Sequence, residues 1–582
     1  MQNYDAIVVG GGHNGLTCAG YLAKAGKKVL VCEARDVVGG LAWTMEMPNA
    51  PGYRVNPASV EYLLTGVQPS VDHQLELHKH GLKWVYPDTL LTWLGPDGQV
   101  MPIWQKREKL VAEIARYSKK DARNYERLVD EITVTLKTAL PYLQGHPVRV
   151  RPQALLEMLT TAAKGRKHIA RGARAMLSSI ESVCEEYFER DEIKVPLACY
   201  SLASFAPAWE QGTGLHLSLI CGLHEWGVRH PVGGTGGFTK ALARCIEHHG
   251  GEVLTSAPVQ EILTHNGKAR GVRLFDGRQF AAPHVVAAVP PKTLVNHLLD
   301  PALIPDEVTD ELRGVDDLHS NIYTFKVDAA LDRRLRYPNH EGDRPYEALS
   351  AVTICPTMEY LNRSANMATI GEFTEEIPIQ HIASSVYDRT LVPEGSEGDT
   401  LYFYAFNTPV ELSGGRSWDD ERDRYKDLML DNFQKYCPDV RDAIIDIDVT
   451  SPDDFVRRYG VGNYEHVDCT LATMGPFRPV PSLAGYRTPV EGVWHTAAGA
   501  FPMAFLSGWP GRNGAREVLR DMSAGPVTRF VDRLLNRSRP KAPALAAAAR
   551  PSMIKGSNTG SGALPTSRRN ASAAHAPQPT KG

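Results

Sequence analysis

Three glycines near the N-terminus have the spacing that holds the pyrophosphate of a dinucleotide. Gly10, Gly12 and Gly15 follow a short β-branched run, and an apolar-periodic helix begins at Leu16. The first glycine allows a tight turn, the second lets the backbone approach the phosphates, and the third lets helix and strand pack closely. The N-terminus of the helix adds free N–H groups and a positive dipole, which stabilise an anion. The pattern therefore predicts a dinucleotide site.

An acidic residue completes this pattern. The strand expected at residues 28–32 ends at Glu33, whose carboxylate can accept hydrogen bonds from ribose hydroxyls. Further cofactor contacts are expected from residues around the glycines and the acid, namely His13, Asn14, Ala34, Arg35 and Leu41. For His13, contact with the cofactor, capping of the helix and exposure to solvent all stay open.

A glycine pair favours FAD over NAD as the dinucleotide. Gly39 and Gly40 begin six residues after the acid. This pair resembles the extended fingerprint of FAD enzymes with a glutathione-reductase-like flavin domain, which NAD-only enzymes usually lack. No second strand–GxGxxG–helix unit is found in the sequence. We therefore predict one FAD and no separate nicotinamide domain.

The composition is that of a large globular enzyme. The chain has 582 residues, of which 43% are hydrophobic and 23% charged, and no apolar run approaches the ~20 residues of a membrane helix. The first strand begins within five residues of the N-terminus, so we expect no signal peptide. Nine cysteines without a CxxC pair predict reduced thiols in the cytoplasm, with no disulfide framework and no zinc site. We predict no bound metal and no nucleic-acid partner.

Strand and helix patterns divide the chain into interleaved domains. We predict an α/β fold in which a Rossmann-type, glutathione-reductase-like FAD-binding domain is interleaved with a mixed α+β substrate domain. The discontinuous FAD-binding domain comprises residues 1–75, 226–300 and 486–525. The substrate domain comprises residues 76–225, which include a helical insertion, and residues 301–485.

The C-terminal region has a different composition. Apolar residues at helical spacing between arginines predict an amphipathic helix at residues 526–537. We favour a last helix docked on the body, and a peripheral membrane helix is the alternative. Residues 538–582 contain seven basic and no acidic residues and are rich in Ala, Pro, Ser and Gly, so we expect a disordered basic tail.

Several motifs together resemble one family. They are the Gly-His-Asn-Gly-Leu run at residues 12–16, the glycine motif at 231–237, Gly-Asn-Tyr-Glu-His at 462–466, Phe-Arg-Pro-Val-Pro at 477–481 and Gly-Arg-Asn at 511–513. With these motifs the chain resembles the phytoene desaturase-related FAD-dependent oxidoreductases. It is most similar to their branch of carotenoid ketolase-like, carotenoid isomerase-like and pyridine nucleotide-disulfide oxidoreductase domain-like proteins. The resemblance spans about residues 3–523.

The resemblance implies flavin chemistry on an apolar substrate. It implies that a hydrophobic, polyene or isoprenoid-like molecule is desaturated or oxidised by hydride transfer to flavin N5, and that oxygen or a quinone reoxidises the flavin. Two other functions stay open. One is a redox-neutral isomerase or a ketolase acting on a carotenoid-like polyene. The other is a binding protein that has kept the fold and lost turnover.

The chain departs from this family beside the flavin. Relatives follow Gly-x-x-Pro with further glycines, which let the backbone pass close to the ring. Here Gly499, Phe501 and Pro502, which we expect to contact FAD, are followed by Met503 and Phe505. Three explanations are open: the ring lies differently, these two side chains form a wall of the substrate cavity, or the usual chemistry has been lost.

The late motif and the residues before the glycine motif offer candidate catalytic and cavity side chains. His466 is a candidate general base because the unperturbed pKa of histidine is near neutrality, and a structural hydrogen bond is the favoured alternative. Arg478 is a candidate partner of a flavin carbonyl, a substrate carboxylate or a structural acid. His224 and Trp226 are candidate cavity residues, with packing as the alternative. The resemblance implies that Val259 offers backbone groups to the adenine.

Overall fold

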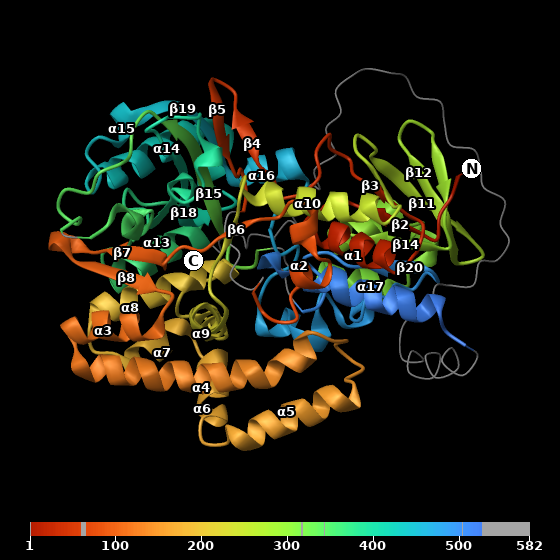
Figure 1. The fold of residues 1–582 in the computed structure, drawn as a ribbon, viewed down its shortest axis with the longest axis horizontal. Coiled ribbons are helices and arrows are strands. Elements are labelled where there is room, and N and C mark those ends of the chain that lie inside the picture. The colour runs from red at the N-terminus through yellow and green to blue at the C-terminus, as the bar shows by residue number, and fades with distance from the viewer. Residues whose placement is uncertain (1, 60–65, 316–317, 343, 503–504, 526–582) are drawn as a thin grey trace, which may run out of the picture.

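The structure, a computed structural model, describes residues 2–59, 66–315, 318–342, 344–502 and 505–525. Figure 1 shows a five-stranded sheet and a four-stranded sheet at one end of the molecule and a seven-stranded sheet at the other. The helices between residues 107 and 226 lie along one side. The predicted C-terminal helix at 526–537 and the tail at 538–582 lie outside the described residues, so both stay predictions.

The five-stranded sheet is entirely parallel, and the first predicted strand lies at its centre. Its order is β10 (Glu252–Leu254), β3 (Val29–Cys32), β2 (Ala6–Val9), β14 (His284–Ala287) and β20 (Val493–His495). Both strands predicted around the glycine turn are thus confirmed. Three separate parts of the sequence contribute to this sheet.

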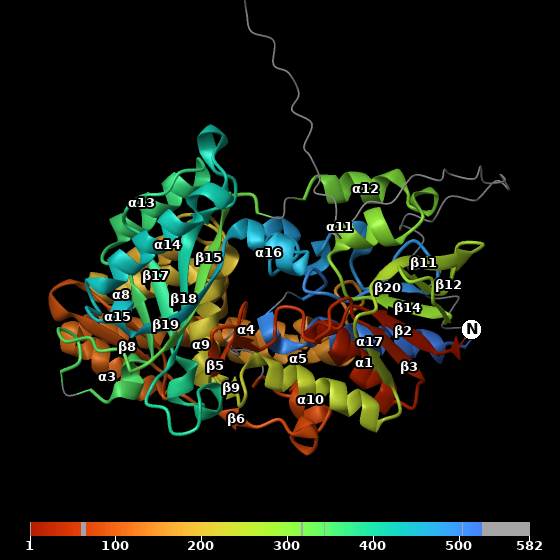
Figure 2. The ribbon, with the colours of Figure 1, turned by 90° about the horizontal axis from the view of Figure 1, so that it is seen from above.

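Side-chain alternation along β2 explains the layers around this sheet. Ala6 and Val8 face the helices α1 (His13–Lys24), α10 (Thr235–His248) and α17 (Trp509–Met522). Ile7 and Val9 belong to the core on the opposite face, because successive side chains of a strand point to opposite sides. That face is covered by β1 (Gln2–Asn3), β13 (Gln279–Ala281), β12 (Lys268–Leu274) and β11 (Val259–His265). Figure 2 shows these two coverings on either side of the sheet.

The seven-stranded sheet is mixed. Its order is β19 (Ile444–Thr450), β15 (Ile322–Leu331), β18 (Thr400–Pro409), β17 (Ile379–Ile382), β16 (Ala351–Ile354), β7 (Thr89–Leu94) and β8 (Val100–Trp104). All neighbours are antiparallel except β16 and β7. One face packs on α14 (Trp418–Gln434) through residues such as Phe325 and Phe403. The opposite face of this sheet does not pack on α14.

A helical segment lies where the sequence predicts the helical insertion. It consists of α3 (Arg107–Tyr117), α4 (Lys119–Leu143), α5 (Pro152–Lys164), α6 (Ile169–Leu177), α7 (Ile180–Tyr187), α8 (Asp191–Ala198) and α9 (Leu217–Trp226). Ser118 separates α3 from α4, because its backbone is extended and its hydroxyl caps α4 by accepting a hydrogen bond from the Asp121 N–H at 3.1 Å. Leu110, Ile114, Leu128 and Ile132 lie on the buried side of this pair.

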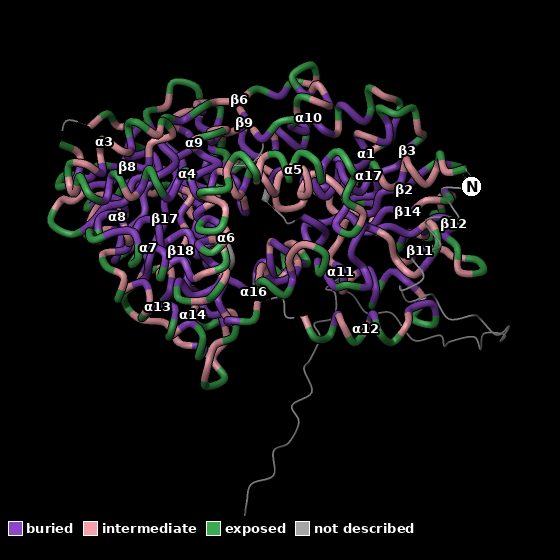
Figure 3. Tube along the Cα trace, turned by 90° about the horizontal axis from the view of Figure 1, so that it is seen from below, coloured by how far each residue is buried: buried purple, intermediate pink, exposed green. Residues whose placement is uncertain are grey.

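Shorter elements connect these layers. The remaining helices are α2 (Val71–Gln74), α11 (Pro291–Thr293), α12 (Asp306–Arg313), α13 (Met358–Thr369), α15 (Val440–Ala443) and α16 (Pro452–Tyr459). Two small antiparallel pairs are β4 (Met45–Met47) with β5 (Ala50–Val55) and β6 (Trp84–Val85) with β9 (His230–Pro231). Figure 3 shows buried residues concentrated in the sheets. None of the described helices is long and apolar enough to cross a membrane.

Candidate active site

The glycine turn is shaped by contacts that only glycine permits. Gly10 has a φ of +102°, and a Cβ there would lie 2.8 Å from the carbonyl oxygen of Ala288. A Cβ on Gly15 would lie 2.1 Å from the carbonyl oxygen of Gly10. Any larger residue would push α1 away from the end of β2, because the obstructing atoms belong to the backbone. Close contacts within the protein therefore require glycine at these two positions.

Gly12 is different, because the protein leaves space beside it. The nearest atom to a Cβ on Gly12 would be Cα of Gly40, at 3.9 Å. Gly12 is also the N-cap of α1 and has no side chain to cap it, so this end of the helix offers backbone N–H groups and a positive dipole to an anion. The glycine pair closes the other side of the turn, where Gly39 donates its N–H to the carbonyl of Gly11 at 2.8 Å. This cradle suits a phosphate.

The acid at the end of β3 faces the same turn. Glu33 is buried, and its Oε2 accepts a hydrogen bond from the Gly11 N–H at 2.6 Å while Oε1 accepts one from the Arg35 N–H at 2.9 Å. The Arg35 guanidinium lies 4.3 Å from the centre of the Trp43 ring. Its Nη2 is buried and has no hydrogen-bond partner among the described residues. Ala34 is exposed beside them. A polar dinucleotide would satisfy this orphaned donor, so the residues fit the predicted cofactor.

An apolar cavity of about 210 Å³ begins at the glycine turn. His13 and Leu41 line the end of the cavity nearest the turn. The face of the seven-stranded sheet that does not pack on α14 provides a polar and aromatic wall through Gln380, Tyr402 and Tyr404. The segment Cys199–Ser204 provides another part of the wall. The Tyr402 hydroxyl donates to the carbonyl of Ala58 at 2.7 Å, and the Tyr404 hydroxyl donates to Gln380. Fixed phenols thus present ring surface to the cavity.

The late motif also reaches this region. Tyr464 and Glu465 line the cavity, whereas His466 turns away with a φ of +64°. A Cβ on Gly499 would lie 3.2 Å from Cβ of His466, so these two predicted site residues are neighbours. Burial, followed by the nearby His495 and Arg478, lowers the pKa of His466 to about 3. An imidazole with this pKa is neutral and a weak base at neutral pH. The role of His466 as general base stays a prediction. Nδ1 of His466 is buried and has no hydrogen-bond partner among the described residues, so the structural hydrogen bond also stays a prediction.

Arg478 is fully buried and holds the late motif in place. Its guanidinium donates to the carbonyls of Glu465 at 2.9 Å, Asp468 at 3.1 Å and Ala498 at 3.1 Å. The Glu465 carboxylate lies 3.4 Å away. These contacts connect the late motif to the segment that follows β20. The structure therefore gives Arg478 chain carbonyls and a structural acid as partners.

Comparisons with known proteins identify the family. Residues 15–359 match the family described as flavin containing amine oxidoreductase. The chain belongs to this flavoenzyme family. It is an FAD-dependent oxidoreductase, and the cofactor and enzyme class expected from the sequence are confirmed. The α/β fold with mixed sheets is that of flavin amine oxidases.

Relatives with curated names confirm the phytoene desaturase-related resemblance. The chain is 27% identical over 555 residues to pyridine nucleotide-disulfide oxidoreductase domain-containing protein 2 of Rattus norvegicus, covering 89% of this chain and 94% of that protein. It is 24% identical over 483 residues to a lycopene-forming phytoene desaturase of Pantoea ananas, covering 81% and 90%. A putrescine oxidase variant superimposes with a TM-score of 0.57 at 16% identity, covering 90% of this chain and 99% of the other.

Other predicted residues of the flavoenzyme lie outside the cavity just described. His224 is held on α9 by the Tyr125 hydroxyl at 2.7 Å and the Gln105 carbonyl at 2.8 Å. Trp226 packs against the helical core of the five-stranded sheet. Both His224 nitrogens thus have partners, and the His224 ring is not among the side chains that line this cavity. The packing alternative fits Trp226.

The remaining flavin contacts are placed as follows. Asn14 is buried in the first turn of α1, and its Oδ1 has no hydrogen-bond partner among the described residues. Val259 begins β11 opposite Leu274. Phe501 is buried in the helical core, with its ring 5.0 Å from that of Tyr142, and Pro502 is also buried. The predicted FAD contacts of these residues stay predictions.

The segment that departs from the family pattern beside the flavin lies only partly within the described residues. Met503 lies outside the described residues, as does the side chain of Phe505, so the three explanations stay open. The backbone of Phe505 starts a short 3₁₀ turn that ends at Ser507. Leu506, in the same turn, lines the cavity. This segment therefore reaches the cavity wall.

The sequence reasoning missed the wall formed by β18. Tyr402 and Tyr404 face the cavity while Phe403 and Ala405 are buried in the core on the other face. The alternation of tyrosines with apolar residues was a signal for a strand with two different faces. No sequence signal indicated that the tyrosine face would meet the segment Cys199–Ser204.

One ion-pair cluster beside this region gives a pH-dependent prediction. His319 contacts Asp468 through Nδ1 at 2.7 Å and Glu210 through Nε2 at 2.8 Å. These two carboxylates, Asp468 first, raise the pKa of His319 from 6.5 to about 10. Because the folded-state pKa is raised, the cluster stabilises the fold fully below pH 6.5, and this contribution is lost as pH rises towards about 10.

At pH 6.5 the wild type should unfold at a higher urea concentration than His319→Gln. We expect this difference between the two unfolding midpoints to decrease steadily between pH 6.5 and pH 10. The same titration of His297→Gln, a change at a histidine with no such carboxylates, controls for general alkaline effects. A difference between wild type and His319→Gln that stays constant across this range would contradict the prediction.

Proposed function

We propose that this flavoenzyme oxidises or desaturates a hydrophobic, polyene or isoprenoid-like substrate in the cavity lined by His13, Leu41, Tyr402 and Tyr404. The observation that carries the proposal is the position of this cavity, which starts at the cofactor turn and is walled mainly by apolar and aromatic side chains. The similarity to a phytoene desaturase supports the same substrate class.

Residues of this chain would bind the cofactor and orient the substrate. Gly12 and the N-terminus of α1 would bind the pyrophosphate of FAD, and Glu33 would bind the ribose. Bound FAD supplies a two-electron acceptor that takes a hydride from the substrate. Tyr402 and Tyr404, fixed by their hydroxyl hydrogen bonds, would orient an apolar chain and exclude water.

We assign the FAD-binding domain, in a glutathione-reductase-like arrangement, to residues 1–75, 226–300 and 486–525. The common parallel sheet of β2, β3, β10, β14 and β20 supports this division, because those strands come from these three ranges. Residues 76–225 and 301–485 would then form the substrate domain. Both contribute to the cavity, through Leu219 and Tyr404 for example.

For reoxidation we propose oxygen or a quinone, since the sequence contains a single dinucleotide unit. Peripheral membrane contact, through which an apolar substrate or a quinone would arrive, is part of the same proposal. Leu155, Leu156 and Leu159 on α5 support it, because all three are largely exposed between the basic residues Arg151 and Lys164.

Anaerobic reduction of the flavin tests the substrate class. A substrate polyene should bleach the oxidised flavin bands stoichiometrically without oxygen. An isomerase would instead need prereduced flavin and consume none. A binding protein would contain no flavin, or flavin that no polyene reduces. Either of these two outcomes would overturn the proposed oxidation.

A substitution in the cavity wall tests whether the substrate binds in this cavity. Ala203 lines the cavity from the segment opposite the sheet. We expect Ala203→Phe to keep its FAD and to lower kcat/KM for the polyene by roughly tenfold or more, because the added ring occupies substrate space. Ala203→Ser, which adds little volume, is the matched control. Equal kcat/KM values for wild type and Ala203→Phe would exclude this cavity as the substrate site.

A further inference from the structure

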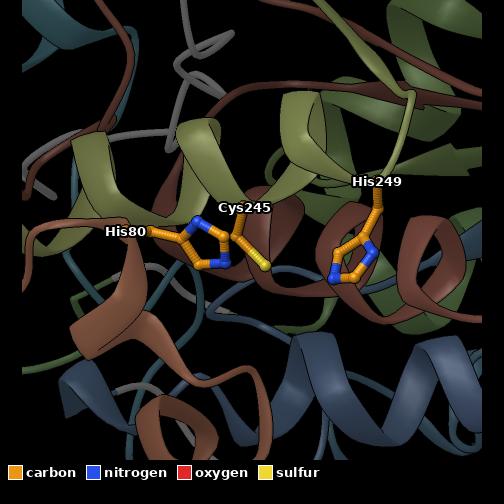
Figure 4. Close-up of side chains that lie close together, drawn as sticks. All are labelled: His80, Cys245 and His249. Carbon is orange, nitrogen blue, oxygen red and sulfur yellow. The ribbon is translucent and has the colours of Figure 1, made fainter.

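Two histidines and a cysteine converge away from the cavity. His80 ends the 3₁₀ turn Leu77–His80, and Cys245 and His249 lie at the end of α10 (Figure 4). One ligand atom from each of the three lies within 4.8 Å of the other two. Their chemistry is that of a metal site, because imidazole nitrogen and thiolate sulfur are the preferred ligands of Zn²⁺.

We propose that His80, Cys245 and His249 bind a divalent transition metal ion, with Zn²⁺ as the best fit, and that water fills the fourth position. The sequence-based prediction of no zinc site rested on the absence of a CxxC pair. The proposed site does not need one, because its ligands come from two segments that are far apart in the chain. Its existence does not depend on the proposed substrate.

Local structure holds these three side chains in position before any metal binds. Cys245 and His249 are four residues apart at the end of α10, so they share one helix face. Arg244 donates from Nη1 to the carbonyl of His80 at 2.9 Å and fixes the end of the turn. The Cys245 thiol points to the carbonyl of Leu75, with Sγ 3.6 Å from the oxygen. The site is therefore largely preformed.

The end of α10 also suits a cation. The C-terminus of a helix carries a partial negative charge, and the three ligands lie at that end of α10. Cys245 is a buried thiol, and Zn²⁺ would replace its proton, which leaves to solvent.

A bound metal would join two parts of the chain. The turn Leu77–His80 follows the first segment of the five-stranded sheet, and α10 covers that same sheet. Crosslinking them would stabilise this layer of the fold by mass action. The expected role of the ion is therefore structural, away from the substrate cavity.

Zinc binding to the full-length, FAD-containing protein tests the proposal. After dialysis against a chelator, calorimetric titration with ZnCl₂ should give one tight site per chain. His80→Gln and His249→Gln should weaken this site by roughly 100-fold or more, since even an outer-shell partner contributes roughly 10- to 100-fold. His78→Gln, an exposed histidine on the same turn, should bind like the wild type.

X-ray absorption identifies the ligands independently of variant stability. The wild type should show one sulfur at about 2.3 Å and nitrogens at about 2.0–2.1 Å from zinc. Cys245→Ser should lose the sulfur and retain its far-ultraviolet circular dichroism. Absence of a tight site in the wild type, zinc without a sulfur ligand, or unchanged affinity in both histidine variants would each overturn the proposal.

Discussion

A Gly12→Asp variant is expected to fold like the wild type and to be purified without FAD. Gly12 has a φ of −68°, which any residue can adopt, and its Cβ would meet no atom closer than 3.9 Å. Aspartate is also a favourable N-cap, so α1 should keep its stability. The new carboxylate would occupy the phosphate cradle and repel the pyrophosphate. We expect FAD affinity to fall by at least about 100-fold, or about 2.7 kcal/mol.

Flavin absorbance per chain and thermal melting of the apoprotein measure these two effects separately. Gly525→Asp adds the same charge at an exposed glycine with open space around it and should bind FAD normally. Gly15→Ala provides the opposite case, because its Cβ would collide with the Gly10 carbonyl, so it should lose the fold itself. Stoichiometric FAD in purified Gly12→Asp would refute the assignment of the phosphate cradle.

Replacing Arg478 should have a large effect on stability. Arg478→Met removes hydrogen bonds to four carbonyls and leaves the buried Glu465 carboxylate without this cation. Breaking a buried ion pair by removing one partner costs about 3–5 kcal/mol. We therefore expect a clearly lower melting temperature for both the apoprotein and the FAD-bound protein.

Two further variants distinguish a structural role of Arg478 from a direct contact with flavin or substrate. Arg478→Lys keeps the charge but loses the planar fork, so its melting temperature should be intermediate. Arg478→Met combined with Glu465→Gln should recover part of the loss, because no negative charge then stays buried beside the missing cation. If Arg478→Met melted like the wild type but altered the flavin spectrum or turnover, a direct flavin or substrate contact would be indicated instead.

The glycine unit shows how much of the cofactor site local sequence can determine. Gly15 is needed for a contact with Gly10 within one strand–turn–helix unit, and Glu33 follows at the end of the next strand. Gly10 itself accommodates the carbonyl of Ala288, which follows the distant strand β14. The glycines and the acid lie within a short stretch of chain, so their spacing can be recognised in the sequence. The strands, the helical insertion, FAD and the enzyme class followed from such local patterns and from the family resemblance.

The candidate site beyond the cofactor could not be predicted in the same way. Arg478 was a candidate for contact with flavin or substrate, but its partners are carbonyls brought together from Glu465 to Ala498 by the fold. His466 carries no sequence sign of the burial that lowers its pKa to about 3. His224 lies near the glycine motif in sequence, yet Tyr125 and Gln105 hold it in the helical insertion.

Two features were decided by the tertiary structure alone. The cavity exists because the tyrosine face of β18 meets the segment Cys199–Ser204, two pieces about 200 residues apart. The proposed metal ligands His80 and Cys245 meet only because α10 packs against the turn that ends at His80. The sequence by itself determined the cofactor turn, because its glycines, its helix and its acid follow one another within about 40 residues. The cavity and the proposed metal ligands required long-range packing, which no short sequence pattern encodes.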